Sequence, residues 1–343
     1  SSRDGRKRIC GRQGVNVETF EITASMVGSP SALPAGAAKR EGMSLALGFF
    51  DGVHVGHACV IRRAAAFAKE RGLISAVMTF DPHPRVVLGK GSAYHAVLTP
   101  LEDKLRLFAQ MGIGAVYIIR FNAEFAAVPA QRFVEELLVP LGVRTAVCGF
   151  DFRFGHGGEG DPELLKRAGG GMDVHVIERI MLEEDKVSSS RIRAELAAGN
   201  CEAAAHLLGR PYAITGQVVH GNAIGRTIGY PTANLEPVSP YVIPRPGVYA
   251  ITADILDEGG NKTESYAGVL NIGRRPTVDK TQDRLTLEAH LFDFSGDLYG
   301  RRLSVQFRKF LRDERKFDSV TELVGQIEKD AAEARRLLKA MPL

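Results

Sequence analysis

Two histidines stand three residues apart in the stretch GFFDGVHVGH, Gly48 to His57, between an apolar run and a helical pattern. Such a pair could bind a metal, stabilise charge on a phosphate, or belong to a purely structural turn. Asp51 and His83 could complete a metal site, but the chain has no HExxH or other recognised ligand spacing. We therefore expect no tightly bound metal centre, and the structural turn stays as an alternative.

The phosphate interpretation has more support, because the pair opens a helix. A helix N-terminus offers unpaired N–H groups and a partial positive charge, which favour phosphate. Gly52 and Gly56 let the backbone approach a ligand closely. His54 and His57 could then stabilise the charge that builds on a phosphoryl group in the transition state.

A second candidate segment is SSSRIRAEL, Ser188–Leu196, which places serines before a helix and Arg191 at its start. Its alternative is an ordinary N-cap followed by a solvated arginine. By contrast, GHGGEG at Gly155–Gly160 matches GxGxxG only formally. It does not follow the first strand, so it does not predict a dinucleotide cofactor.

The segment GFDFRFG carries three phenylalanines, Phe150, Phe152 and Phe154. Near a binding edge they could stack on a flat ring system. The alternative is that they pack into the core.

The densest signal of the second half is HGNAIGRTIGYPTANL, His220–Leu235. Its glycines permit a loop around a phosphate, although no lysine follows as in a Walker motif. Thr232 and Asn234 supply oxygen ligands of the kind that Mg²⁺ prefers. Glu288, inside the strand pattern LTLEAHLFDF, could accept a proton from an attacking hydroxyl. A solvent-facing Glu288 is the alternative.

The elements that must position these residues change character along the chain. From Ser44 to about Leu208, apolar runs alternate with helical patterns, which predicts a doubly wound parallel α/β sheet. Ligands bind such sheets beyond the carboxyl ends of the strands, where Gly48–His57 falls. After Pro211, strictly alternating runs predict a small antiparallel β-barrel with a C-terminal helix. We expect residues 1–20 to be a flexible tail, and 21–208 and 209–343 to be the two domains.

Net charge, the length of apolar runs and cysteine spacing indicate which partners and which cellular location to expect. The net charge is only +4, with 40 acidic residues spread among the basic ones, so we expect no nucleic-acid partner. No apolar run reaches the length of a membrane span. The four separated cysteines lack CxxC spacing and suit a reducing cytoplasm. The sequence is compatible with a homo-oligomer.

Taken together, the motifs resemble the bifunctional prokaryotic riboflavin kinase/FMN adenylyltransferase (FAD synthetase) family. H-x-G-H itself is similar to the nucleotidylyltransferase signature. The resemblance runs from about Gly42 to Leu338 and rests on many motifs in one order. They are GFFDGVHVGH, TFDPHPR, GFDFRFG, SSSRIR, GRTIGYPTAN, GVYA, GVLNIGRRPTV, LEAHLFDF, DLYG and FLRDERKFDS.

The resemblance implies a nucleotidylyltransferase domain that joins FMN to the AMP part of ATP, and a barrel that phosphorylates riboflavin. It implies catalytic roles for His54, His57 and Arg191 at the first site and for Glu288, as the base, at the second. Thr232 and Asn234 would bind Mg²⁺ with ATP. Flavin contacts would come from Asp151, Phe152, Phe154, Asn271 and Arg312. ATP contacts would come from Gly48, Phe49, Asp51, Gly56, Ser189, Ser190, Gly221, Gly225, Arg226, Thr227, Gly229 and Pro231.

This sequence departs from the family pattern in places. Phe49 stands where many relatives carry Asn, and Tyr230 replaces the more usual Phe before PTAN. Two other functions stay open at this point. One is a monofunctional adenylyltransferase with a non-catalytic flavin-binding barrel, and the other is a non-catalytic regulator. The intact Thr232, Asn234 and Glu288 count against the first, and the intact histidines count against the second.

Overall fold

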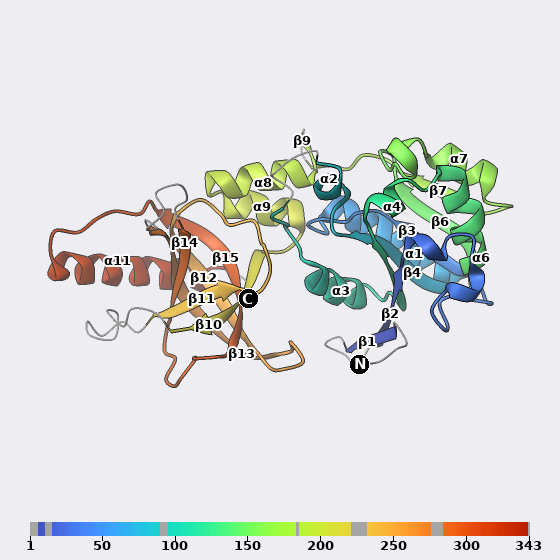
Figure 1. The fold of residues 1–343 in the computed structure, drawn as a ribbon. Coiled ribbons are helices and arrows are strands. Elements are labelled where there is room, and N and C mark those ends of the chain that lie inside the picture. Colours follow the sequence, from blue (N-terminus) through green and yellow to red (C-terminus); the bar gives the residue numbers. More distant parts are fainter. Residues whose placement is uncertain are drawn as a thin grey trace. The chain divides into compact units, whose positions relative to one another are not determined.

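The computed structural model describes residues 6–10, 16–89, 95–182, 185–220, 232–275 and 284–341. It divides into two compact units, Ser1–Ser188 and Ser189–Leu343. One contains an open sheet covered by helices and the other a barrel with helices (Figure 1). The predicted fold class is confirmed for both.

The first unit is built on a seven-stranded sheet in the order β1-β2-β5-β4-β3-β6-β7. All neighbouring pairs from β2 to β7 are parallel, and only β1 is antiparallel. The strands are β1 (Arg6–Cys10), β2 (Asn16–Ile22), β3 (Met43–Leu47), β4 (Ile74–Asp81), β5 (Ala115–Arg120), β6 (Val143–Gly149) and β7 (Asp173–Ile177).

Alternate residues of these strands enter two separate cores, one on each face of the sheet. In β3, Leu45 and Leu47 join one core and Ala46 joins the other. The main helices are α1 (Val55–Arg71), α3 (Leu101–Gln110), α5 (Ala130–Phe133), α6 (Val139–Leu141) and α7 (Pro162–Ala168). Helices α1 and α3 cover the Ala46 core, and α5 to α7 cover the other core. This is the doubly wound arrangement.

Shorter elements complete this unit. Between α5 and α6 the chain passes through a π-turn, η4 (Val134–Leu138), just before Pro140, whose missing N–H interrupts regular α-helical bonding. The remaining short elements are η1 (Ala24–Met26), η2 (Pro30–Ala32), α2 (Pro84–Val87), α4 (Ala123–Ala126), η5 (His156–Gly158), β8 (Met181–Leu182) and β9 (Asp185–Lys186).

The prediction of a flexible tail over residues 1–20 is wrong for its described part. β1 pairs with β2, and β2 pairs with β5 inside the sheet. Val17 and Phe20 are fully buried, one in each core. The apolar pattern was hidden by two glutamates, which the fold accommodates because Glu18 pairs with Lys39 and Glu21 with Arg120.

The second unit begins with α8 (Ser189–Ala198) and α9 (Cys201–Leu208) and continues into a closed antiparallel barrel. The barrel order is β10-β11-β14-β13-β12-β15. Its strands are β10 (Tyr212–Val219), β11 (Ala233–Pro237), β12 (Gly247–Leu256), β13 (Lys262–Arg275), β14 (Arg284–Leu291) and β15 (Arg302–Arg312). The predicted alternation in β15 is confirmed, since Leu303, Val305 and Phe307 are fully buried.

The C-terminal helix α11 (Val320–Lys339) packs on the outside of the barrel. Ala334 and Leu338 of its apolar stripe contact the core that contains Val248 and Ala250 of β12. Val320, in the first turn of the helix, is 62% exposed, whereas Ala334 and Leu338 near its end are buried.

The compact units meet between Ser188 and Ser189, whereas the change of sequence pattern places the boundary near Leu208. Helices α8 and α9 contact the barrel through a backbone hydrogen bond and an ion pair, among other contacts. The backbone N–H of Arg245 donates to Leu196 O, and Lys309 forms an ion pair with Glu202. The independent folding of 21–208 and 209–343 stays a prediction.

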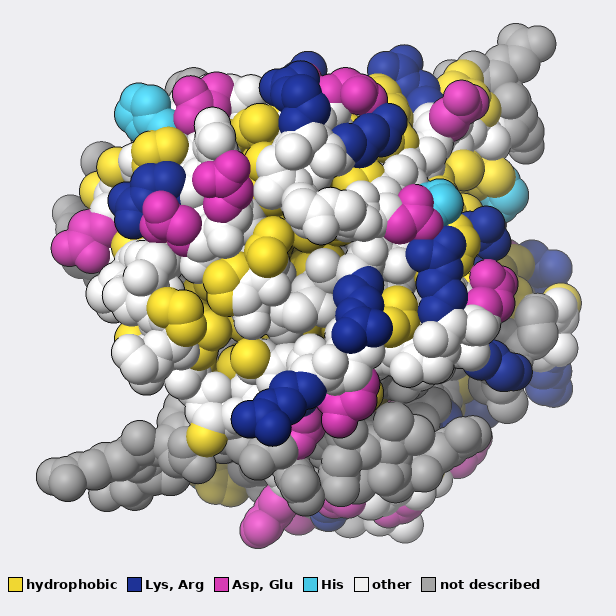
Figure 2. Space-filling view, turned by 90° about the vertical axis from the view of Figure 1, so that its right-hand side faces the viewer, with side chains coloured by type: hydrophobic (Ala, Val, Ile, Leu, Met, Phe, Trp, Pro, Cys, Tyr) yellow, Lys and Arg dark blue, Asp and Glu magenta, His cyan; other side chains and the backbone are white. Residues whose placement is uncertain are grey.

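One face of the molecule illustrates the distribution of charge. In Figure 2, Lys and Arg side chains are interspersed with Asp and Glu side chains, with apolar side chains between them. This mixture agrees with the low net charge of +4.

Candidate active sites

The loop between β3 and α1 lies at the carboxyl edge of the first sheet, where β3 has β4 on one side and β6 on the other. Such a point, where the strand order reverses, is where open α/β sheets bind ligands. The loop has an unusual backbone: Phe50 and Val53 have φ angles of 53° and 42°. Non-glycine residues rarely adopt this region. Both side chains are buried, which anchors the turn.

The two histidines lie together at the start of α1. His54 is the N-cap residue, and its Nδ1 accepts a hydrogen bond from the His57 N–H at 3.2 Å. The imidazole rings stack with centroids 3.5 Å apart and an interplanar angle of 16°. Phe50 packs edge-on against His57. The structure thus brings both imidazoles to the positive end of a long helix, where an anion is stabilised.

Two glycines of the motif make room for these rings. A Cβ on Gly56 would lie 3.1 Å from Cε1 of His54, and a Cβ on Gly48 would lie 2.7 Å from the Phe50 ring. A side chain at Gly48 would therefore collide with Phe50, and one at Gly56 would crowd His54. The proposed ATP contacts of both glycines stay predictions.

Asp51 and Phe49 tie this loop to the rest of the first unit. Asp51 is buried, and its Oδ1 accepts hydrogen bonds from the N–H groups of Leu98 and Thr99. The carbonyl oxygen of Phe49 accepts from Lys104 Nζ at 2.8 Å and from Thr79 Oγ1 at 3.0 Å. ATP contacts of Asp51 and Phe49 stay predictions, since the observed bonds are internal.

Sequence reasoning missed Lys104 and Thr79. Lys104 shares the buried side of α3 with Leu105 and Phe108. A lysine on an apolar helical stripe was the signal that could have identified it.

The GFDFRFG segment at the end of β6 places its phenylalanines differently. Phe152 and Phe154 are buried in the core and stack with centroids 5.6 Å apart, which favours the packing alternative. Phe150 is 38% exposed and carries the Arg179 guanidinium over its ring. Asp151 is exposed. Flavin contacts of Asp151, Phe152 and Phe154 stay predictions.

The formal GxGxxG match has a structural explanation. A Cβ on Gly155 or Gly160 would collide with Ala130. Glu159 Oε1 accepts from the Ala130 N–H at 2.9 Å and so caps α5. These residues pack a loop against α5.

Arg191, Ser189 and Ser190 form the first turn of α8 in the second unit. The Arg191 side chain is 30% exposed and its Nε lies 3.7 Å from Glu195 Oε1. The assignment of these three residues to the ATP site stays a prediction.

In the barrel, three of the predicted residues lie on adjacent strands in direct register. Asn234 of β11 pairs with Glu288 of β14, and Glu288 pairs with Asn271 of β13. The same row continues to Val248 of β12 and Arg312 of β15. Paired residues in antiparallel strands point to the same face. Val248 contributes to the core that α11 covers, so this row lies on the outer face of the barrel.

The polar groups of this row are partly shielded. Asn234, Asn271 and Glu288 are half-buried, and Thr232 just before them is exposed. Asn271 Oδ1 is buried and has no hydrogen-bond partner among the described residues. A buried amide oxygen of this kind is costly unless a ligand or water supplies a donor.

Arg312 ends the row and connects the barrel to α11. Its guanidinium donates to both carboxylate oxygens of Asp330, with Nη2 2.8 Å from Oδ2. Asp330 also accepts from Gln326 Nε2 at 2.8 Å. Arg312 is therefore engaged in holding the helix, and a flavin contact for it stays a prediction.

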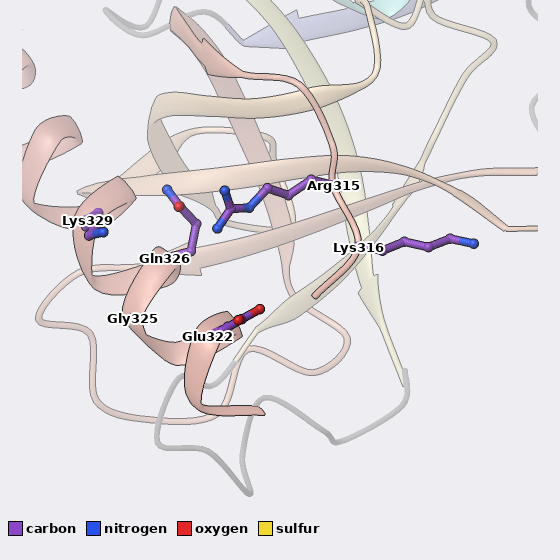
Figure 3. A pocket seen from close by; sticks show the side chains of 6 residues that line it. All are labelled: Arg315, Lys316, Glu322, Gly325, Gln326 and Lys329. Carbon is purple, nitrogen blue, oxygen red and sulfur yellow. The ribbon is translucent and has the colours of Figure 1, made fainter. Parts of the chain in front are cut away.

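A pocket of about 470 Å³ lies between α11 and the chain that follows β15. Arg315 and Gln326 point toward one another, whereas Lys316 points away from the helix (Figure 3). The residues that line it are Arg315, Lys316, Glu322, Gly325, Gln326 and Lys329.

Several predicted residues lie outside the described residues, namely Gly221, Gly225, Arg226, Thr227, Gly229, Pro231 and Tyr230. Within the described ranges, no group of three or more His, Cys, Asp or Glu side chains could hold a metal ion. In the same part of the chain, no helix has the length and apolar character needed to cross a membrane.

Family models match both halves of the chain. The FAD synthetase model matches residues 37–191 and the riboflavin kinase model matches residues 208–338. The bifunctional riboflavin kinase/FMN adenylyltransferase of Bacillus subtilis (strain 168) is 42% identical over 85% of this chain and 91% of its own. The protein with the same name from Escherichia coli (strain K12) is 42% identical over 87% and 93%.

A solved structure agrees over nearly the full length. A protein from Streptococcus pneumoniae, described as a macrolide-efflux protein, is 31% identical with a TM-score of 0.80. The match covers 92% of this chain and 98% of that chain. It supports the two-part fold.

Proposed function

The chain belongs to the bifunctional riboflavin kinase/FMN adenylyltransferase family, and on that premise we propose which residues carry each of its two reactions. The enzyme phosphorylates riboflavin with ATP to give FMN, and it then joins FMN to the AMP part of ATP with release of pyrophosphate. A non-catalytic barrel is not favoured, because the riboflavin kinase model spans 208–338.

For adenylyl transfer, we assign charge stabilisation to His54 and His57. A phosphate oxygen of FMN attacks the α-phosphorus of ATP, the bond to the β-phosphate oxygen breaks, and pyrophosphate leaves. The nucleophile is already an anion, so no general base is needed and charge stabilisation is the main task. The observation that carries this assignment is the stacked imidazole pair at the N-terminus of α1. Arg191, Ser189 and Ser190 are proposed to add contacts to the phosphates.

For riboflavin phosphorylation, we assign the role of base to Glu288. The 5′-hydroxyl of riboflavin is neutral, so it gains from a carboxylate that accepts its proton while it attacks the γ-phosphorus of ATP. Glu288 lies in direct register with Asn234 and Asn271 on the outer face of the barrel. This row is the observation that supports the assignment.

Mg²⁺ is proposed to accompany ATP at the second site. Thr232 lies just before β11 and Asn234 lies within it, and they offer a hydroxyl and an amide oxygen, which fit a hard cation. When bound, the cation would neutralise charge on the phosphates. The glycines of 221–229, with Arg226, Thr227 and Pro231, are proposed to surround the phosphates.

The flavin of the kinase reaction is proposed to lie along the row from Glu288 toward Arg312. Asn271 Oδ1 could accept a hydrogen bond from the substrate, which would satisfy its buried oxygen. At about 4.8 Å per strand, the row from Asn234 to Arg312 spans about 19 Å. The pocket beside α11 has the volume of a small-molecule site.

The cellular setting is also a proposal. Cys148 and Cys201 are free and buried, which is usual in a reducing compartment, so we propose a cytoplasmic location. We propose small molecules as the partners, without nucleic acid, and a homo-oligomer is compatible with these assignments.

The direct test is to incubate the full chain with riboflavin, ATP and Mg²⁺ and to separate riboflavin, FMN and FAD chromatographically. We expect FMN to form first and FAD to follow, with ADP and pyrophosphate as the respective by-products. The residue assignments require that substitutions at Glu288 and His57 affect different steps. Equal damage to both steps by either substitution, in a folded protein, would overturn the two-site assignment.

A further inference from the structure

Lys104 is a lysine in an unexpected place. It lies on the buried side of α3 and is only 8% exposed. Lysine side chains are almost never buried unless they are paired. Burial lowers the pKa of its ammonium group, while the Asp51 and Asp81 carboxylates oppose that shift. A buried cation near two carboxylates is unlike an ordinary packing residue.

The ammonium group acts on the loop that carries the histidines. Lys104 Nζ donates to Phe49 O at 2.8 Å, and Thr79 Oγ1 donates to the same oxygen at 3.0 Å. The next residue, Phe50, begins the turn and has a positive φ angle. The peptide before the turn is thus held by two donors from two different elements, α3 and β4.

A second tie comes from the same region of the chain. Asp51 Oδ1 accepts from the N–H groups of Leu98 and Thr99, which precede Pro100, the N-cap residue of α3. The segment 98–104 is therefore hydrogen-bonded to the loop on both sides of Phe50, at Phe49 and at Asp51. Backbone in a sparsely populated conformation persists only where its surroundings over-determine it. Phe50 and Val53 are both in that state, and His54 follows Val53 directly.

We infer that Lys104 is a positioning residue for adenylyl transfer, which fixes the Phe49 carbonyl and thereby the turn that aims His54 and His57 at the α-phosphate of ATP. This inference rests on the proposed role of the two histidines. In this role Lys104 does not contact the reacting atoms. It acts through the peptide between Phe49 and Phe50, with Asp51 as the second tie.

The test uses the full chain and both activities. In Lys104→Met the side chain keeps a similar length, but the donor and the charge are lost. Misplacement of reacting groups by about 1 Å can cost about 100-fold in rate. We expect kcat for FMN adenylylation to fall by about 10- to 100-fold, with KM for ATP and FMN changing by less than about threefold. Riboflavin phosphorylation by the same protein should be unchanged. Exposed Lys69→Met is the matched control and should alter neither activity.

Thr79→Val probes the same carbonyl independently. It removes the second donor to Phe49 O with little change of shape, so it should also lower kcat for adenylylation alone. Lys104→Arg restores a charged donor and should recover part of the rate lost in Lys104→Met. If Lys104→Met does not fold, the Thr79→Val and Lys104→Arg results decide the question.

Three results would overturn the inference: unchanged adenylylation in folded Lys104→Met, equal loss of both activities, or an effect on KM alone. His57→Ala, measured in parallel, separates this inference from the one it rests on. If His57→Ala loses adenylylation and Lys104→Met does not, only the role of Lys104 is wrong. If His57→Ala keeps full adenylylation, the histidine assignment itself is wrong.

Discussion

Asn234 and Glu288 lie directly opposite one another on β11 and β14, on the outer face of the barrel. The register therefore places the amide that is proposed to hold Mg²⁺–ATP next to the carboxylate that is proposed to take the proton. Glu288 pairs on its other side with Asn271. The Glu288 carboxylate therefore lies between two amide side chains, in a position to accept the proton of a hydroxyl that binds beside either of them.

Glu288→Gln should slow FMN formation by about 10²- to 10⁴-fold, because the base is lost while the size of the side chain is kept. The same variant should still convert supplied FMN to FAD. The measurement is chromatographic separation of the three flavins, in reactions started from riboflavin and separately from FMN. Exposed Glu236 of β11 is a matched position, and Glu236→Gln should leave both rates unchanged. A Glu288→Gln rate within about threefold of wild type would rule out the base.

His57→Ala should cut FAD formation by about 10²- to 10³-fold, which is the usual loss for one charge-stabilising donor. Riboflavin phosphorylation should continue, so FMN should accumulate in a reaction started from riboflavin. His206, in α9 of the second unit, offers a control, and His206→Ala should leave FAD formation intact. Loss of FMN formation in His57→Ala would contradict the division of labour.

The sequence predicted the strand–helix alternation, the barrel and most element positions, because the apolar periods are regular there. It failed at β2, where Glu18 and Glu21 interrupt the apolar pattern of the strand. In the fold, these two glutamates form ion pairs with Lys39 and Arg120, which are distant in the sequence. Ion pairs between residues far apart in the chain leave no local pattern.

The candidate sites were predictable to different degrees. The closeness of His54 and His57 follows from local helical spacing, whereas the pairing of Asn234 with Glu288 depends on strand register. Lys104 was missed because it donates its hydrogen bond to a backbone carbonyl. Every residue has a backbone carbonyl, so the sequence does not indicate which one accepts the bond.

Phe20→Ala should lower the free energy of unfolding by about 3–5 kcal/mol, the usual cost of removing a fully buried phenylalanine. Phe20 is 0% exposed and stacks on Tyr117 of the neighbouring strand. Urea unfolding of the full chain measures the change, with exposed Arg62→Ala as the control. A flexible tail would instead predict no change. Wild-type stability in Phe20→Ala would show that β2 does not belong to the folded sheet in solution.

Two fragments test where the second domain begins. A fragment that starts at Ser189 keeps the bond from Arg245 N–H to Leu196 O and the Glu202–Lys309 ion pair, whereas a start at Ala203 removes both along with buried Cys201. Both fragments should make FMN without FAD, and the longer one should melt at a higher temperature. Thermal unfolding and flavin chromatography provide the measurements. Equal melting temperatures would favour a boundary near Leu208.

Lys104 also predicts how stability depends on pH. Its pKa in the folded protein is lowered from 10.5, mainly by burial. Between that lowered pKa and 10.5 the unfolded chain binds more protons than the folded chain, so the free energy of unfolding rises with pH. Below the lowered pKa both states are protonated, and the cost of burying the charge is constant. Lys104→Met lacks this titration.

The free energy of unfolding of the wild type, minus that of Lys104→Met, should therefore increase as the pH is raised from about 7 toward about 10. Urea unfolding of both proteins across this range gives the difference directly. Lys69→Met serves again as the control for the loss of an exposed lysine. If the Lys104 difference fell with rising pH, the lysine would have to gain its proton on folding rather than lose it. The carboxylates of Asp51 and Asp81 would then outweigh burial, and the pKa of Lys104 would be raised rather than lowered by folding.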